Sequence, residues 1–211
     1  MSTFPTDPAA ITTESFRRID ALLAPYGLEA DTYPIVRRVV HTTADLEWVS
    51  SLRFHPRAIA AAVAALRGGA ALVTDVRMVA AGVGAAGLAR HGCAVHCAID
   101  APEAARLASE AGITRAMAAL RLLARQFPEA IYVVGNAPTA LFEILRLHAA
   151  GLVAPPLVIG VPVGFVSTVE SKVALMRAHD LPWISNIGPK GGSAVAASIV
   201  NALLELAGDG G

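Results

Sequence analysis

Four short apolar segments in this chain are each followed by turn-forming residues and then by a helical pattern. They are ALVTD (71–75), AVHCAI (94–99), IYVVG (131–135) and PLVIGVP (156–162), with PWISNIG (182–188) as a weaker fifth. Strands that alternate with helices form a parallel sheet, which needs helices on both of its faces. We therefore predict a three-layer α/β fold with its ligand-binding loops at the carboxyl ends of the strands.

The N-terminal third of the chain has a helical pattern instead. Apolar residues recur at helical spacing over 14–27, 33–49 and 56–69, and Thr12 and Thr13 precede the first of these segments. No linker and no repeat divides the chain. We expect the helical part, about residues 12–69, to pack on the α/β core within one domain that spans 1–211.

Polar residues mark the starts of three later helices. Asp100 with Glu103, and Ser167 with Glu170, have the spacing of a capping box. Ser193 is placed to cap the last helix. We therefore predict that helices begin directly after Asp100, Ser167 and Ser193.

Charge and hydropathy argue against several classes of partner. Seventeen Lys and Arg residues balance seventeen Asp and Glu residues, so the overall charge favours neither nucleic acid nor an anionic membrane surface. Although 55% of the residues are apolar, no unbroken apolar run reaches the roughly 18 residues that a spanning helix needs. With two cysteines and no secretory leader pattern, the sequence predicts a cytoplasmic protein with reduced thiols.

One glycine pattern suggests a nucleotide site. Gly82, Gly84 and Gly87 form GxGxxG, which in a tight strand-to-helix turn binds a dinucleotide. Seven residues separate this pattern from the preceding strand, and no acidic residue ends a following strand about 20 residues later. We therefore interpret the glycines as a flexible loop or a close backbone approach.

A cluster of metal-ligand residue types occurs over seven residues. His91, Cys93, His96 and Cys97 make up this cluster. On a strand, Cys93 and Cys97 point to one face while His96 points to the other, so the four side chains do not converge on one ion. We predict small buried thiols and no metal site.

His41 is the strongest candidate for acid–base chemistry. It lies in RRVVHTTAD, after Arg37 and Arg38, with Asp45 four residues later. Imidazole titrates near neutral pH, yet a lone histidine is often structural, so the residues alone leave both roles open. The two arginines point about 100° apart on a helix, which lets one face a ligand carboxylate while the other faces solvent.

Two glycine-containing loops are candidate anion sites. GNAPTAL (135–141) places Asn136 between a strand and a helix, and GPKGGS (188–193) places a lysine and two glycines just before the last helix. Backbone N–H groups at helix starts bind anions, and the lysine adds charge. A phosphate, a nucleotide or a polycarboxylate fits this pattern, and GPKGGS also suits a structural helix cap.

Seven segments, taken in order, resemble the precorrin-8X methylmutase family, which includes the cobalt-precorrin-8 methylmutases. They are SF (15–16), RRVVHTTAD (37–45), DVRMVAAGV (75–83), GITR (112–115), GNAPTALFEIL (135–145), IGVPVGFVSTVESK (159–172) and GPKGGSAVAASIVNALL (188–204). The resemblance extends from Ser15 to about Leu204. It implies a flavodoxin-like fold and a homodimer with shared active sites.

This resemblance implies an isomerase of cobalamin biosynthesis. Members of the family move a methyl group from C-11 to C-12 on ring C of the macrocycle in a 1,5-sigmatropic shift. The product is hydrogenobyrinic acid, or cobyrinic acid when the substrate contains cobalt. The resemblance implies no cofactor, because the migrating methyl group is already on the substrate.

The resemblance also assigns residue roles. The catalytic histidine of the family falls on His41, whose proton on the ring C nitrogen would lower the barrier to migration. Ser15 and Arg38 fall on substrate-contact positions. We add as predicted substrate-binding residues Thr42, Arg115, Asn136, Lys190, Gly191, Gly192 and Ser193, with Arg115 and Lys190 as carboxylate partners.

The sequence leaves two details open. Ser171 and Lys172 lie in a matching motif, where Lys172 is either a substrate contact or a solvated helix residue. Family members often have a basic residue where this chain has Pro189, with Lys190 following, so the carboxylate contact at this loop is undetermined.

Two alternative functions are compatible with the residues. A tetrapyrrole carrier would bind and protect an intermediate without converting it. A nucleotide-dependent oxidoreductase would use Gly82, Gly84 and Gly87. The sequence also does not decide whether the substrate contains cobalt.

Overall fold

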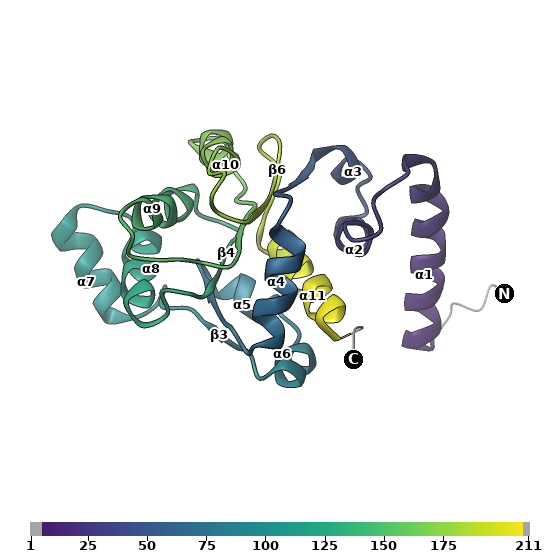
Figure 1. Ribbon diagram of the computed structural model, residues 1–211, viewed down its shortest axis with the longest axis horizontal. Helices are drawn as coiled ribbons and strands as arrows, with labels where there is room; N and C mark the ends of the chain where they lie inside the picture. Colours follow the sequence, from purple (N-terminus) through teal and green to yellow (C-terminus); the bar gives the residue numbers. More distant parts are fainter. Residues whose placement is uncertain (1–5, 209–211) are drawn as a thin grey trace.

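The computed structural model describes residues 6–208, which form a six-stranded sheet with helices on both faces (Figure 1). The strands are β1 (Leu52–Phe54), β2 (Ala71–Thr74), β3 (Ala94–His96), β4 (Ile131–Val134), β5 (Val158–Gly160) and β6 (Trp183–Asn186). Their order across the sheet is β1-β6-β5-β4-β2-β3. All neighbouring strands are parallel except β1 and β6. The five parallel strands have the flavodoxin-like order, which confirms the predicted fold class.

The central strands are buried on both faces. In β4, Ile131 and Val133 belong to one hydrophobic core, whereas Tyr132 and Val134 belong to the core on the opposite face. Each of these four residues is buried. This two-sided burial explains why the segment is uniformly apolar rather than alternating.

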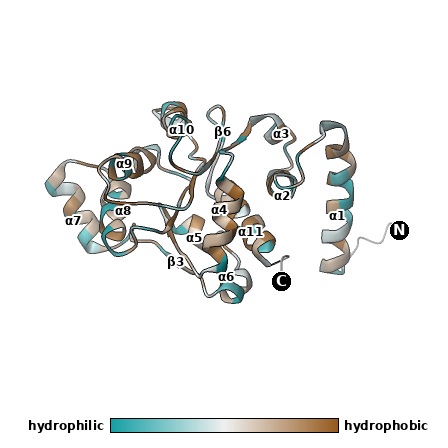
Figure 2. Ribbon diagram, viewed as in Figure 1, coloured by the Kyte–Doolittle hydropathy of each residue, from teal (hydrophilic) through white to brown (hydrophobic). Residues whose placement is uncertain are grey.

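One helical layer contains the N-terminal part of the chain. Its helices are α1 (Pro8–Leu23), η1 (Ala24–Tyr26), α2 (Tyr33–Thr43), α3 (Trp48–Ser51), α4 (Ala58–Arg67), α5 (Arg77–Gly82), α6 (Ala85–His91) and α11 (Ser193–Gly208). The apolar α11 contacts α2, α4, α5 and α6, and Figure 2 shows its hydrophobic residues in brown. Helix α1 packs on α2 and lies farthest from the sheet (Figure 1).

The opposite face is covered by the other four helices. They are α7 (Pro102–Ala111), α8 (Arg115–Gln126), α9 (Pro138–Ala149) and α10 (Thr168–Met176). Neighbours in this layer contact one another in the order α7, α8, α9, α10. Because α8 and α9 lead into β4 and β5, their C-terminal ends lie at the amino-end edge of the sheet.

Two segments differ from the predicted secondary structure. The sequence indicated one helical stretch over 33–49, but α2 ends at Thr43 because Ala44 adopts the left-handed conformation, with φ of 52°. The antiparallel strand β1 was not predicted. It has only three residues, Leu52–Phe54, and follows α3 directly, so no turn residues and no periodicity mark it.

The glycine pattern over 82–87 belongs to a helical segment. Gly82 ends α5, and a Cβ atom there would lie 2.7 Å from the Cβ of Ala197 in α11. Gly84 precedes α6, and Gly87 within α6 packs against Leu204. The expected close approach is therefore confirmed as helix packing, whereas the flexible-loop interpretation and the dinucleotide turn are both wrong.

Three predicted helix starts need correction. Asp7 caps α1 by accepting hydrogen bonds from the backbone N–H groups of Ala9 and Ala10, so the helix begins before Thr12. Ala101 holds the N-cap position of α7, which leaves Asp100 one residue too early to cap it. Helix α10 does begin directly after Ser167, as predicted, but Ser167 is left-handed and makes no capping bond, because a capping side chain needs extended backbone. The last helix begins at Ser193 itself, one residue before the predicted start.

Within residues 6–208, no helix combines the length and the apolar character that crossing a membrane requires.

Candidate functional site

His41 lies in the last turn of α2, where α1 crosses beside it. Its Nδ1 atom is 3.1 Å from the hydroxyl oxygen of Ser15 on α1. One of the two atoms donates to the other, depending on the imidazole tautomer. The His41 side chain is exposed, and its Nε2 atom has no hydrogen-bond partner within residues 6–208. The hydroxyl therefore orients the ring and leaves Nε2 for a ligand.

A stack of side chains fixes the orientation of the His41 ring. The Phe16 ring packs against His41 with a centroid distance of 4.7 Å, and the Arg37 guanidinium lies 4.0 Å from the centre of the same Phe16 ring. Arg37 is itself held by two hydrogen bonds to Asp20, of 2.6 and 2.8 Å, and Tyr33 donates to the same carboxylate. The Arg37 guanidinium is therefore already paired with Asp20 and packed on Phe16.

A cavity of about 270 Å³ opens next to His41. It is lined by Ser15, Arg18, Ile19, Leu22, Val40, His41, Ala44 and Leu46. A neighbouring hollow of about 460 Å³ along α1 shares Ser15 and Arg18 with this cavity. The site thus combines an apolar wall, one titratable imidazole and a guanidinium at the rim.

Arg38 and Thr42 lie on α2 but do not line the His41 cavity. Arg38 forms an ion pair with Glu205 of α11 and borders a different pocket, of about 300 Å³. The Thr42 hydroxyl donates to the backbone carbonyl of Arg38 at 2.9 Å, as exposed threonines in helices commonly do. A role of either residue in substrate binding stays a prediction.

Lys190 is held by two carboxylates. Its Nζ atom lies 2.7 Å from Asp45 Oδ2 and 2.5 Å from Glu47 Oε2. These contacts raise the pKa of Lys190, and the lysine in turn lowers the pKa of Asp45. The loop before α11 is thereby tied to the segment that follows the His41 helix. The charge of Lys190 is already balanced, which weakens its predicted role as a carboxylate partner.

Buried Lys172 also holds the loop before α11. This side chain is 1% exposed, and its ammonium group donates to the carbonyls of Gly188 at 2.9 Å and Lys190 at 2.5 Å. Burial lowers the pKa of Lys172 to about 8. The solvated-residue interpretation of Lys172 is therefore wrong. Asn186 donates to the Lys190 carbonyl as well, at 2.9 Å.

The glycines of the loop are packed closely. A Cβ atom on Gly191 would lie 2.2 Å from the carbonyl oxygen of Val161, and the Gly192 N–H donates to that same oxygen at 2.9 Å. Ser193 is buried at the start of α11. This geometry supports the structural interpretation of GPKGGS and leaves its anion-binding role as a prediction.

The predicted anion nest over 135–137 already holds a carboxylate from within the chain. Asp75, fully buried after β2, accepts hydrogen bonds from the N–H groups of Gly135 at 3.1 Å, Asn136 at 2.8 Å and Ala137 at 2.7 Å. Burial raises the pKa of the Asp75 carboxyl, while these three bonds oppose that rise. The contact closes the crevice between β2 and β4, where the strand order reverses.

Neither Arg115 nor Asn136 lines the His41 cavity. Arg115 is the first residue of α8, on the opposite face of the sheet from α2, and its side chain is exposed. The Asn136 side chain is exposed at the carboxyl end of β4. One copy of the chain therefore does not bring these two residues into the His41 cavity.

The His91–Cys97 segment forms no converging cluster. His91 hydrogen-bonds to the Leu204 carbonyl at 3.0 Å, while His96 stacks on Phe127. Cys93 and Cys97 are free and half-buried. Residues 6–208 contain no group of three or more His, Cys, Asp or Glu side chains that could hold a metal ion.

Comparison with known proteins shows the family of this chain. The family model described as precorrin-8X methylmutase matches residues 10–206. The chain belongs to the precorrin-8X methylmutase family. A solved precorrin-8X methylmutase from Thermus thermophilus superimposes with a TM-score of 0.88 at 40% identity, covering 96% of this chain and 98% of the other.

Relatives in this family carry two names. The cobalt-precorrin-8 methylmutase of Priestia megaterium is 41% identical over 203 residues, which cover 96% of this chain and 90% of the relative. The precorrin-8X methylmutase of Pseudomonas aeruginosa is 40% identical over 198 residues, which cover 93% and 95%. Because the two identities are so close, they do not distinguish a cobalt-containing from a cobalt-free substrate.

Proposed function

We propose that this protein is an isomerase of cobalamin biosynthesis that moves a methyl group from C-11 to C-12 on ring C of precorrin-8X or cobalt-precorrin-8. The observation that supports this most strongly is the imidazole of His41, oriented by Ser15 and Phe16 beside an apolar cavity, in a chain of this family. The product is hydrogenobyrinic acid or cobyrinic acid. Any cobalt present belongs to the substrate.

In the proposed mechanism, His41 is a general acid and then a general base. In this step the imidazole carries protons on both nitrogens, with Nδ1–H donating to the Ser15 hydroxyl. The Nε2 proton is transferred to the ring C nitrogen and leaves a neutral imidazole, and the protonated nitrogen draws electron density from the conjugated system and lowers the barrier to migration. The carbon–methyl bond at C-11 then breaks while the bond at C-12 forms. The proton returns to His41, so the substrate and product have equal mass and no electrons are gained or lost.

The rest of catalysis is positioning. The Ser15 contact fixes the imidazole, and the Phe16 ring, held in turn by Arg37, limits its rotation. Holding the reacting groups in one geometry removes much of the entropic part of the barrier. Ser15 is thus both a substrate contact, as the resemblance implies, and a positioning residue for His41.

The active form in this proposal is a homodimer with shared active sites. A cavity of about 270 Å³ is small for a tetrapyrrole with several acid side chains, since drug-sized ligands already occupy about 300–1,000 Å³. Apolar side chains stand exposed on loops at the carboxyl edge of the sheet, with Phe165 98% and Val166 82% exposed. A second copy seated there would cover this surface and bring its own Arg115 and Asn136 to the His41 cavity.

Conversion of the substrate tests the proposed activity. The purified protein is incubated with precorrin-8X, and separately with its cobalt complex, without any added cofactor. We expect an isomer of equal mass with a changed visible spectrum, formed by the wild type and by His179→Ala, which removes another exposed histidine. His41→Ala should bind without converting. Binding without conversion by the wild type, for both substrates, would support the carrier function instead.

Mixing inactive variants tests the shared sites. His41→Ala and Arg115→Ala each damage one side of every site, but a mixed dimer contains one site with both residues intact. Statistical mixing predicts recovery of about one quarter of wild-type activity. Absence of any recovery after subunit exchange, or sedimentation as a monomer at assay concentration, would contradict the shared-site proposal.

A further inference from the structure

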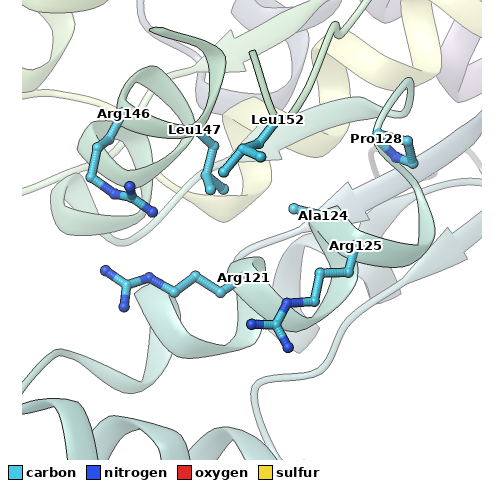
Figure 3. Close-up of a pocket in the computed structure, with 7 residues that line it drawn as sticks. All are labelled: Arg121, Ala124, Arg125, Pro128, Arg146, Leu147 and Leu152. Atoms are coloured by element: carbon cyan, nitrogen blue, oxygen red, sulfur yellow. The ribbon is translucent and has the colours of Figure 1, made fainter. Parts of the chain in front are cut away.

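A further pocket lies on the opposite face of the sheet from His41. Its volume is about 570 Å³, and it is lined by Arg121, Ala124, Arg125, Pro128, Arg146, Leu147 and Leu152 (Figure 3). These residues come from the C-terminal halves of α8 and α9 and from the segments that follow them. The pocket is therefore near the amino-end edge of the sheet, and it shares no residue with the His41 cavity.

The pocket has more positive than negative side chains. Arg121 and Arg146 both bond to Glu143, whose side chain is 0% exposed, with shortest distances of 2.7 Å. Burial acts to raise the pKa of Glu143, but the bonds from Arg146 and Arg121 outweigh it and hold the pKa below its usual value. Arg125 is exposed and forms no side-chain hydrogen bond or ion pair within residues 6–208.

This arrangement leaves an excess of about two positive charges. Three guanidinium groups line the pocket and one carboxylate balances them. The C-terminal ends of α8 and α9 each contribute roughly half a negative charge, which offsets about half of the excess. The pocket therefore retains a positive potential, and its guanidinium groups have the planar donors that bind carboxylates and phosphates.

The other wall of the pocket is apolar. Leu147 lies on the buried face of α9, and its side chain lies next to that of Leu152, between Arg146 and Ala124 (Figure 3). The Leu152 N–H donates to the Leu147 carbonyl. Leu152 is 59% exposed. A guanidinium cluster beside an exposed leucine matches a ligand that has an anionic end and an apolar body.

We propose that this pocket is a second binding site, for a small organic dianion such as a phosphate monoester or a dicarboxylate. The anionic group contacts Arg125 together with the exposed parts of Arg121 and Arg146. The carbon skeleton of the ligand covers Leu152. This site is independent of the proposed methyl transfer.

Calorimetric titration at low ionic strength tests the site with two probes, phenyl phosphate and phthalate. We expect saturable binding of at least one probe, weakened at least fivefold by Arg125→Gln. Arg177→Gln is the matched control, because Arg177 is also an exposed arginine at a helix end with no side-chain partner within residues 6–208. It should leave binding unchanged. Methylmutase activity should be the same in wild type, Arg125→Gln and Arg177→Gln.

A second variant tests the apolar wall. Leu152→Ser should weaken the binding of phenyl phosphate while leaving that of inorganic phosphate unchanged. Absence of saturation with both probes, no effect of Arg125→Gln, or equal weakening by Arg125→Gln and Arg177→Gln would overturn the proposal. Equal effects of Leu152→Ser on phenyl phosphate and inorganic phosphate would overturn the part that assigns the apolar body to Leu152.

Discussion

Lys172 should make the protein more stable as the pH rises above 8, and Lys172→Met should remove this effect. The buried ammonium has its pKa lowered from 10.5 to about 8 by burial. Between these two values the unfolded chain binds a proton that the folded chain does not, so the free energy of unfolding increases with pH. Integrating this difference from pH 7 to pH 9.5 gives a gain of about 2 kcal/mol.

Urea unfolding followed by tryptophan fluorescence measures this gain, because Trp48 and Trp183 are both buried. The comparison is the change in unfolding free energy between the two pH values in wild type and in Lys172→Met. Lys190→Met is the control, since the raised pKa of Lys190 keeps that lysine protonated in both states over this range. Its pH dependence should match the wild type.

Equal pH dependence in wild type and Lys172→Met would refute the reasoning. It would mean that the Lys172 ammonium is solvated, or that its hydrogen bonds to the Gly188 and Lys190 carbonyls fully offset the cost of burial. NMR of the unsubstituted protein with carbon-13-labelled lysine side chains measures the pKa of Lys172 in the folded state directly. A value near 10.5 for Lys172 would likewise contradict the account.

Three further substitutions test the packing around the loops and the buried charges. Gly191→Ala places a Cβ atom 2.2 Å from the Val161 carbonyl oxygen. It should lower the free energy of unfolding in urea by about 1–3 kcal/mol and reduce activity. A variant as stable as the wild type would show that the loop moves freely to accept the methyl group. Asp75→Asn turns an amide N–H₂ group toward backbone N–H donors and should lower the free energy of unfolding by about 1–3 kcal/mol. An unchanged midpoint of urea unfolding would contradict the role of this carboxylate. Glu143→Gln should destabilise the protein most at neutral pH and less at pH 3. The reason is that Arg146 and Arg121 lower the pKa of the Glu143 carboxyl, so its contribution to stability decreases once the unfolded chain binds a proton that the folded chain does not. An equal loss of unfolding free energy at pH 3 and pH 7 would contradict this.

The sheet was predictable because its strands are buried on both faces. Segments such as IYVVG are apolar throughout, and that signal does not depend on any distant residue. The antiparallel strand β1 is different. Its pairing with β6, which places Leu52 opposite Asn186, is a long-range contact that the three residues Leu52–Phe54 do not indicate.

The charges of the candidate site were harder to predict, because their partners are far apart in the sequence. Lys190 was expected to meet a ligand carboxylate, but Asp45 and Glu47 occupy it. Likewise, Arg38 pairs with Glu205. Sequence spacing identifies which residue types lie near a loop, whereas their neutralisation depends on the tertiary fold.

In the loop over 135–137, too, the partner of a predicted site comes from a distant part of the same chain. Its N–H groups do form an anion nest, as its sequence indicates, but the anion is Asp75, which lies 60 residues earlier. An acidic residue directly after a buried strand is a usable signal for such an internal partner. Among the candidates, His41 is exposed beside Ser15 and its Nε2 atom has no partner within residues 6–208, and its catalytic role stays a prediction.

The most direct test of the central claim follows the methyl group itself. Precorrin-8X carrying carbon-13 in the C-11 methyl group is incubated with wild type and with His41→Ala, and carbon-13 NMR records the position of the label. The account predicts that the wild type moves the label to C-12 without loss to solvent, while His41→Ala leaves it at C-11. Migration at the wild-type rate in His41→Ala would contradict the assignment of His41 as the general acid.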